Sequence, residues 1–123
     1  MTQNIAIIGS NHSGEVFYNE MTRLKRKGVN VVCVYNRTGL DLNSMAETAG
    51  IKRLSIEEIV DLGENLDVIF DLSGDTEIRA ELRKTLFSSH NQHTVIAPES
   101  VAQVMWAMIS DEQLPGSDGK LGY

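Results

Sequence analysis

A chain of 123 residues is long enough to form one domain with a buried core, without metal or disulfide support. Eleven basic and seventeen acidic side chains give a net charge of -6, which argues against electrostatic binding to nucleic acid or to an anionic membrane surface. The single cysteine excludes an intrachain disulfide, and no segment approaches the roughly 20 apolar residues of a membrane span. We therefore expect a cytoplasmic protein that binds neither nucleic acid nor membrane.

The first apolar run predicts a strand that leads into a helix. Residues 5–8, IAII, end at Gly9, as expected of a strand buried on both faces. Apolar side chains then recur at helical spacing from Gly14 to Leu24, and Gly28 provides a C-terminal stop.

A second strand and a second helix follow in the same order. Residues 30–35, NVVCVY, predict a strand that buries the thiol of Cys33. A shorter helix is expected over 42–49 with a stop at Gly50, and IKRL at 51–54 predicts a short third strand.

The third helix carries its own start signal. Ser55 and Glu58 have capping-box spacing, and the helix is expected to end at Gly63. DVIFDL at 67–72 predicts the fourth strand, and the turn SGD leads into a helix that reaches at least Leu86.

The chain closes with a fifth strand and a last helix. HTVIA at 93–97 predicts the strand, and Pro98 suits the first turn of a helix that ends at about Ile109. The sequence then loses its periodicity, so we expect one domain over 1–110 and a flexible tail or linker over 111–123.

Strands that alternate with helices predict an α/β fold with a parallel sheet covered on both faces. We expect a doubly wound sheet of five strands in the order 3-2-1-4-5. In such a sheet the ligand crevice lies beyond the carboxyl ends of the strands, at the point where the strand order reverses. The loops at 9–14, 36–39 and 72–76 should therefore meet around any ligand.

The first loop has the outer features of a phosphate-binding turn. Gly9 suits the tight turn, Gly14 lets the helix lie close to the strand, and the amides at the helix start favour a pyrophosphate. Asn11 stands where the dinucleotide fingerprint has its middle glycine, so the phosphate contact is weakened, shifted or lost. A ligand site and a bare structural turn both remain open. The candidate residues of this loop are Gly9, Ser10, Asn11, His12, Ser13 and Gly14.

The second loop bears on the choice of cofactor. NAD sites carry a carboxylate at the end of the second strand for the ribose hydroxyls, whereas this chain has Asn36, Arg37 and Thr38. A guanidinium suits a 2′-phosphate, which favours NADP slightly over NAD. The NRT stretch also resembles the signature of NADP-dependent shikimate dehydrogenases. Alternatively, Arg37 is a solvated loop cation that Asp41 neutralises.

The third loop would pass beside the ribose and nicotinamide half of a dinucleotide. Ser73 and Gly74 are the candidate binding residues there. Asp75 or Thr76 is explained more simply as the N-cap of the following helix.

The sequence offers no complete catalytic machinery. His12 lies at the phosphate end of the expected crevice, while His90 and His93 flank the start of the fifth strand on the opposite edge. No histidine and carboxylate complete a triad with Ser10 or Ser13. We expect that the chain alone is not an enzyme.

Several stretches carry a family resemblance. IAIIGSNHSGE, VVCVYNRT and MAETAGIKRLSIEEIVDLGENLDVIFDLSGDTEIRAEL resemble the N-terminal nucleotide-binding domain of glucose-fructose oxidoreductase-like and dihydrodipicolinate reductase-like enzymes. LDVIFDLSGDTEIRAELRK and VIAPESVAQVMWAMI are similar to Rossmann-type domains at the N-termini of some bacterial sensor histidine kinases and transcriptional regulators. This second resemblance implies a dehydrogenase half without its catalytic half, used for sensing or regulation. It makes Gly9 and Gly14 the phosphate-turn glycines, Asn36 and Arg37 the ribose end, and Gly74 a residue near the nicotinamide.

Two other functions remain open from the sequence. The chain could be the cofactor-binding half of an oxidoreductase that lacks its substrate domain. It could also be a domain of the same fold that binds coenzyme A, or that binds no ligand and serves as an interaction module.

The last helix has two apolar sides. One side carries Val101, Val104, Met105 and Met108, and the other carries Ala102, Trp106 and Ile109. One side can cover the sheet, and the other needs a second cover. We expect either a homodimer through the Trp106 side or a downstream domain, unless Trp106 folds back over the core.

Overall fold

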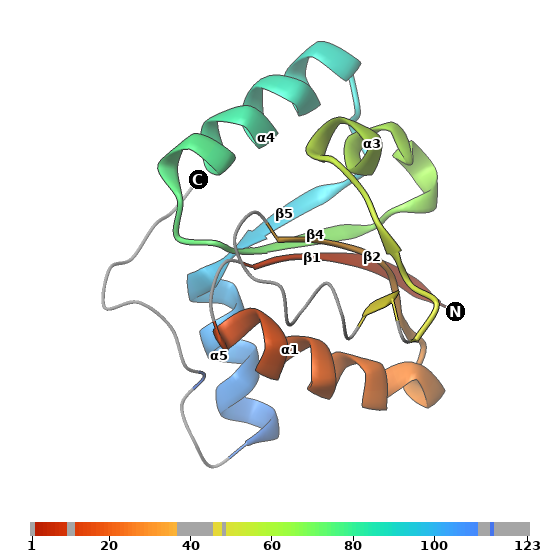
Figure 1. Cartoon of the computed structure of the whole chain (residues 1–123), viewed down its shortest axis with the longest axis vertical. Coiled ribbons are helices and arrows are strands. Elements are labelled where there is room, and N and C mark those ends of the chain that lie inside the picture. Colours follow the sequence, from red (N-terminus) through yellow and green to blue (C-terminus); the bar gives the residue numbers. More distant parts are fainter. Residues whose placement is uncertain (1, 10–11, 37–45, 48, 111–113, 115–123) are drawn as a thin grey trace.

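The computed structural model describes residues 2–9, 12–36, 46–47, 49–110 and 114 (Figure 1). In chain order the elements are β1 (Gln3–Gly9), α1 (His12–Arg23), the 3-10 turn η1 (Leu24–Lys27), β2 (Val29–Asn36), β3 (Lys52–Arg53), α3 (Ile56–Asp61), the 3-10 turn η2 (Gly63–Asn65), β4 (Val68–Leu72), α4 (Thr76–Ser89), β5 (Val95–Pro98) and α5 (Glu99–Ile109).

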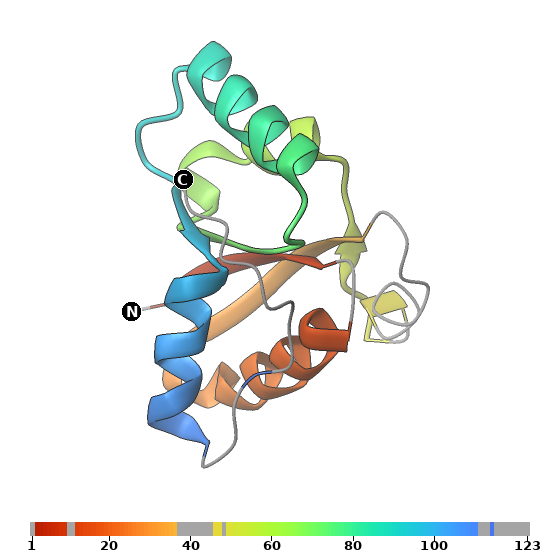
Figure 2. The same ribbon diagram turned by 90° about the vertical axis from the view of Figure 1, so that its left-hand side faces the viewer.

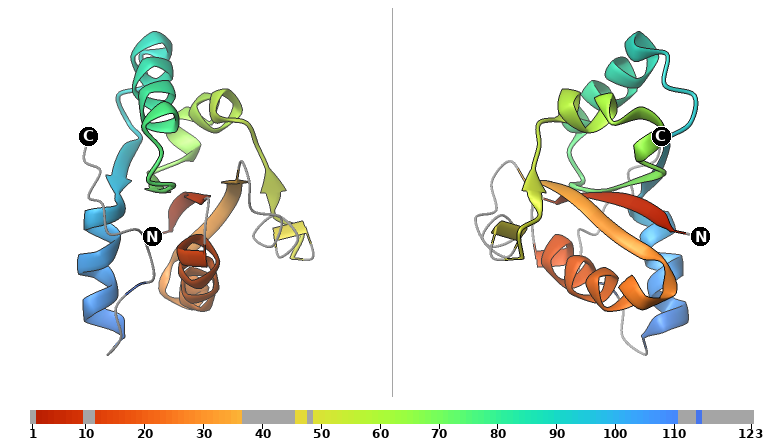
Figure 3. Two further views of the ribbon diagram at one scale, coloured as in Figure 1. Left: turned by 60° about the vertical axis from the view of Figure 1, so that its left-hand side comes forward. Right: turned by 90° about the vertical axis from the view of Figure 1, so that its right-hand side faces the viewer.

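The five strands form one parallel sheet in the order β3-β2-β1-β4-β5. Helices α3 and α4 cover one face of this sheet, and α1 and α5 lie on the other, which Figures 2 and 3 show with the sheet between the two helix layers. The architecture is the doubly wound, Rossmann-like α/β fold, and the predicted fold class and strand order are confirmed.

The central strand β1 contributes side chains to both halves of the core. Ile5 and Ile7 join the cluster on the α1 and α5 side, whereas Ala6 and Ile8 join the cluster on the α3 and α4 side. Burial of each isoleucine side chain contributes about 1.5–3 kcal/mol of stability. The continuous apolar run that predicted this strand is therefore a consequence of helices on both faces.

Helix ends follow the signals in the sequence. Gly28 ends the α1–η1 segment with φ 91°, a conformation that glycine adopts without strain. At the start of α3, the Glu58 amide donates to Ser55 Oγ at 3.2 Å, and the Ser55 amide donates to Glu58 Oε1 at 3.0 Å. This capping box confirms the predicted start, and its hydrogen bonds from Ser55 hold the pKa of Glu58 below the ordinary value.

Two strands are shorter than the sequence predicted. The fifth strand starts at Val95 instead of residue 93, because Asn91 Oδ1 accepts the amides of His93 and Thr94, each at 3.0 Å, and holds them in a turn. The third strand contains only Lys52–Arg53 instead of 51–54. The helix expected over 42–49 lies outside the described residues except at three positions, Ala46, Glu47 and Ala49.

The chain after α5 returns to the core at one described position. Leu114 is buried in the cluster on the α1 and α5 side, and its carbonyl accepts a hydrogen bond from Gln103 Nε2 at 3.0 Å. A packed residue therefore lies inside the expected tail 111–123, the rest of which lies outside the described residues and stays a prediction. Within the described residues, no helix has both the length and the apolar character needed to cross a membrane.

Candidate functional site

The carboxyl ends of three strands lie at one level of the sheet. Gly9, the last residue of β1, is in register with Asn36 of β2 and with Leu72 of β4. Because the strand order reverses between β1 and β4, this is the point where doubly wound sheets bind ligands. The structure thus brings the starts of the three predicted loops together.

The loop from β1 to α1 is a tight strand-to-helix connection. Gly9 and Gly14 are both buried, and α1 starts at His12, three residues after the end of β1. The first amides of a helix have no partner within the helix and point toward the crevice end, where the helix dipole favours an anion. Of the other candidate residues, His12 and Ser13 are described only as helical backbone, while Ser10 and Asn11 lie outside the described residues.

The loop after β2 is described only at its start. Asn36 is the last residue of the strand and is buried, with 9% of its surface exposed. Arg37, Thr38 and Asp41 lie outside the described residues. The preference for NADP over NAD therefore stays a prediction from the sequence.

The loop after β4 is held by hydrogen bonds between its own residues. The buried carboxylate of Asp71 accepts the Ser73 amide at 3.0 Å and the Ser73 hydroxyl at 2.6 Å, both at Oδ1. Ser73 Oγ in turn accepts the Asp75 amide at 3.2 Å. Gly74, with φ 63°, completes the turn in a conformation that other residues rarely adopt.

The following helix starts as the sequence predicted. Asp75 Oδ1 accepts the amides of Glu77 at 2.8 Å and of Ile78 at 3.4 Å, so Asp75 is the N-cap of α4. Asp75 is thus committed to the helix start.

A buried carboxylate next to this loop was missed from the sequence. Glu99 is 6% exposed and is the first residue of α5, directly after Pro98, which is in register with Asp71. The helix dipole favours an acid at this position. An acid directly after the proline that ends the fifth strand was the available signal, because that position lies at the carboxyl end of the sheet.

The carboxylates gather on one side of the crevice. Asp71, Asp75 and Glu99 follow β4 and β5, while the amides at the start of α1 follow β1. Like charges repel, so a phosphate is favoured at the α1 start and disfavoured beside β4 and β5. Hydroxyl and amide donors suit the β4 side instead.

The two histidines near β5 lie at the opposite end of the sheet from the crevice, as predicted. His93 Nε2 lies 2.7 Å from Asp67 Oδ1, and the Asn4 amide donates to Asp67 Oδ2 at 2.7 Å. These two contacts, with the Asn4 amide as the larger cause, hold the pKa of Asp67 below its ordinary value.

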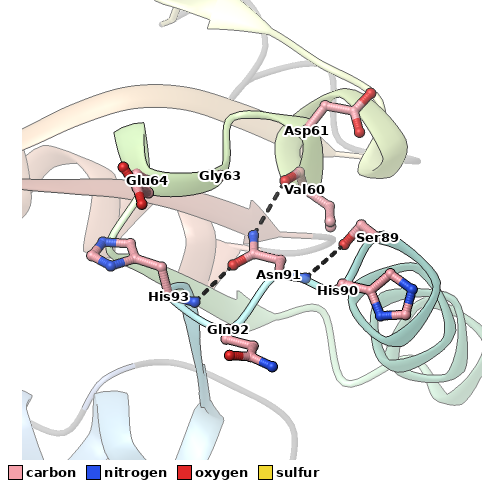
Figure 4. Close-up of a pocket in the computed structure, with 9 residues that line it drawn as sticks. All are labelled: Val60, Asp61, Gly63, Glu64, Ser89, His90, Asn91, Gln92 and His93. Carbon is pink, nitrogen blue, oxygen red and sulfur yellow. Dashed lines mark hydrogen bonds between the residues drawn. The ribbon is translucent and has the colours of Figure 1, made fainter.

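Both histidines line a pocket of about 590 Å³ at this end of the sheet (Figure 4). The ring of His90 points away from His93, and Asn91 between them ties the loop to α3 through a hydrogen bond to the Val60 carbonyl at 3.2 Å. Among the described residues, no group of three or more His, Cys, Asp or Glu side chains could hold a metal ion. The contacts of Asn91 and His93 therefore explain this cluster as structural.

The direction of α5 corrects one prediction. Trp106 is 6% exposed and lies in the core, with its ring centroid 6.2 Å from that of Phe17 on α1. A homodimer through the Trp106 side is therefore wrong as to the face of the helix, because the sheet and α1 already cover that side. Trp106 folds back over the core, the alternative that the sequence left open.

Comparison with solved structures places the fold among known proteins. S. aureus homoserine dehydrogenase at pH 6.0 superimposes with a TM-score of 0.58 at 15% identity, over 89% of this chain and 29% of that enzyme. RSP in complex with β-NAD⁺ and operator DNA superimposes with a TM-score of 0.55 at 12% identity, over 88% of this chain and 55% of that protein. No protein-family model and no curated protein matches the sequence.

These similarities establish a Rossmann-like domain that is similar to part of a dehydrogenase and to part of an NAD⁺- and DNA-bound protein. At this identity they establish the fold alone. The chain spans less than a third of the homoserine dehydrogenase and about half of RSP.

Proposed function

We propose that the chain is a dinucleotide-binding domain that holds NADP or NAD and serves a sensory or regulatory role, without catalysing a reaction on its own. The observation that carries this proposal is the register of Gly9 with Asn36 and Leu72 at the point where the strand order reverses. Helix α1 opens directly beyond Gly9.

The geometry supports one orientation of the dinucleotide. The pyrophosphate lies at the start of α1, where the amides and the helix dipole favour negative charge. The adenine ribose lies beyond Asn36, and the nicotinamide ribose lies beside Ser73 and Gly74. The carboxylates on the β4 and β5 side then face hydroxyl groups and stay away from the phosphates.

The roles of the polar side chains support a domain that binds without catalysis. Asp71, Ser73 and Asp75 hold each other and the start of α4, and His93 is engaged with Asp67 at the far end of the sheet. A general base must lie within hydrogen-bond reach of the reacting atom. A regulatory role also agrees with the fold of RSP, which was solved with β-NAD⁺ and operator DNA.

A second candidate function is the cofactor-binding half of an oxidoreductase whose substrate domain lies elsewhere. The similarity to homoserine dehydrogenase, of which this chain spans 29%, favours it. Both candidates require a dinucleotide. A domain that binds coenzyme A, or no ligand, does not.

The experiment is a thermal melt of the protein with NAD, NADP, NADPH or coenzyme A at millimolar concentration. A ligand present at 100 times its dissociation constant stabilises the folded state by about 2.7 kcal/mol, which raises the melting temperature by several degrees. We expect this rise with a dinucleotide and a smaller one with coenzyme A. A melting temperature that no dinucleotide changes would count against both dinucleotide functions.

A further inference from the structure

The outward side of α5 carries an apolar stripe, which we define as Val101, Val104 and Met108. Their side chains are 43%, 64% and 74% exposed, respectively. Spacings of three and four residues place them along one side of the helix, across from Ala102 and Trp106, which are buried. Helix α5 therefore has apolar side chains on two opposite sides, and only one of them faces the core.

Charge distinguishes this stripe from the outer surface of α4. Between Glu99 and Asp111 the sequence has no ionisable side chain, so all of α5 beyond its first residue is uncharged. Helix α4 instead exposes Glu81, Arg83 and Lys84. A surface helix of a monomer normally has a polar outer side, and an exposed apolar patch marks an interaction surface.

The chain that follows α5 is directed to a different side of the helix. Gln103 holds the carbonyl of Leu114 at 3.0 Å, and Leu114 is buried on the α1 side. At 100° per residue, Gln103 lies about 100° around the helix from Val104 and about 140° from Met108. The return of the chain to Leu114 thus leaves the apolar stripe open to a partner.

We propose that a second copy of this chain covers the apolar stripe, with α5 of each copy packed against the other about a two-fold axis. Two copies that each carry a net charge of -6 repel one another, so their contact requires a surface without charge, and α5 provides one. The spacing of the three side chains is that of successive core positions in paired helices. A two-fold contact uses the same patch on both copies, so the stripe needs no other surface.

The size of the stripe sets the strength of the association. Three side chains from each copy bury far less than the roughly 1,600 Å² of a standard stable interface. We therefore expect a weak dimer that dissociates on dilution. This inference does not depend on the ligand and would stand if the dinucleotide site failed its own test.

The first experiment is sedimentation equilibrium between about 10 µM and about 1 mM, a range that brackets weak association. We expect a dimer that dissociates on dilution, and an increase of the dissociation constant by at least about 100-fold in Val104→Glu and Met108→Glu, because each variant buries two unpaired charges per dimer. Phe87→Glu on α4, at an equally exposed apolar side chain, is the matched control and should leave the constant unchanged. Thermal melts check that each variant is folded.

The second experiment uses disulfide formation between copies. Burial raises the pKa of the only native thiol, Cys33, to about 12, so that thiol does not react. Val104→Cys should give a covalent dimer under mild oxidation, whereas Phe87→Cys should stay monomeric. A wild-type protein that is monomeric at about 1 mM, or a dimer that survives both glutamate substitutions, would overturn the proposal.

Discussion

Asn11 is the residue at which this chain departs from the dinucleotide fingerprint, between two buried glycines that keep it. A side chain at that position obstructs the approach of a phosphate to the backbone. We expect Asn11→Gly to strengthen dinucleotide binding by about 1 kcal/mol, or roughly fivefold in the dissociation constant. Isothermal titration with NAD and NADP measures the change.

The control for Asn11→Gly is a glycine substitution on the exposed surface away from the crevice, such as Ser88→Gly on α4. It removes a side chain without touching the first loop and should leave the affinity unchanged. If Asn11→Gly weakens binding instead, the asparagine itself contacts the ligand, and the obstruction argument is wrong.

Arg37 is the residue that separates NADP from NAD. If its guanidinium pairs with the 2′-phosphate, Arg37→Ala should weaken NADP binding by roughly 1.5 to 3 kcal/mol and leave NAD nearly unchanged, as for a hydrogen bond to a charged group. Titration of both cofactors measures the difference.

Arg53→Ala is the matched control for Arg37→Ala. Arg53 is an exposed cation on the neighbouring strand β3, and its guanidinium lies 3.0 Å from the Glu47 carboxylate. Equal losses of NADP and NAD affinity in Arg37→Ala, or similar losses of NADP affinity in the two variants, would remove the preference for NADP.

At the scale of the element, α3 depends on its cap because it has only six residues. Ser55→Ala removes the hydroxyl that accepts the Glu58 amide, and we expect the free energy of unfolding to fall by about 1 kcal/mol. Urea denaturation at neutral pH measures it. Ser88→Ala, on the exposed surface of α4, should change little by comparison, and an equal loss there would show that the cap is not the cause.

Elements that depend on local signals were predictable from the sequence. The apolar run before Gly9, the capping box at Ser55 and the cap at Asp75 are each set by neighbours within a few residues. The start of β5 was not predictable, because it depends on an Asn91 side chain that also bonds α3 across 31 positions of sequence. The side of α5 that faces the core depends on the distant ring of Phe17, so periodicity alone could not choose it.

The candidate site was predictable only in its location. The reversal of strand order fixes which loops meet, and the sequence supplied that order. The burial of Asp71 and Glu99 next to one another arises from the pairing of β4 with β5, which no local pattern encodes.

At the scale of the whole molecule, stability should depend on acid through the end of the sheet opposite the crevice. The pKa of Asp67 is lowered from its ordinary 3.8, first by the Asn4 amide and then by His93. A depressed pKa contributes stability that is present above the unfolded value and is lost as the pH falls through the folded one. This contribution should therefore be complete above about pH 5 and vanish below pH 3.8 as Asp67 is protonated.

Asp67→Asn tests this dependence. We expect the variant to be less stable than the wild type at pH 6, with the difference shrinking toward about pH 2.5, when urea unfolding is compared at both values. Asp61→Asn, at an exposed carboxylate on α3, is the control. A gap between wild type and Asp67→Asn that is the same at both pH values would argue against the linkage.

The bonds within the loop from Asp71 to Asp75 limit how the protein could report on a ligand. The loop holds its shape through its own side chains, so occupation of the crevice would neither order it nor need to displace it. A ligand shifts a conformational equilibrium only as far as it binds one state more tightly than the other. This wall of the crevice therefore behaves as a fixed template, and any message passed to a partner has to originate on the β1 and β2 side of the ligand.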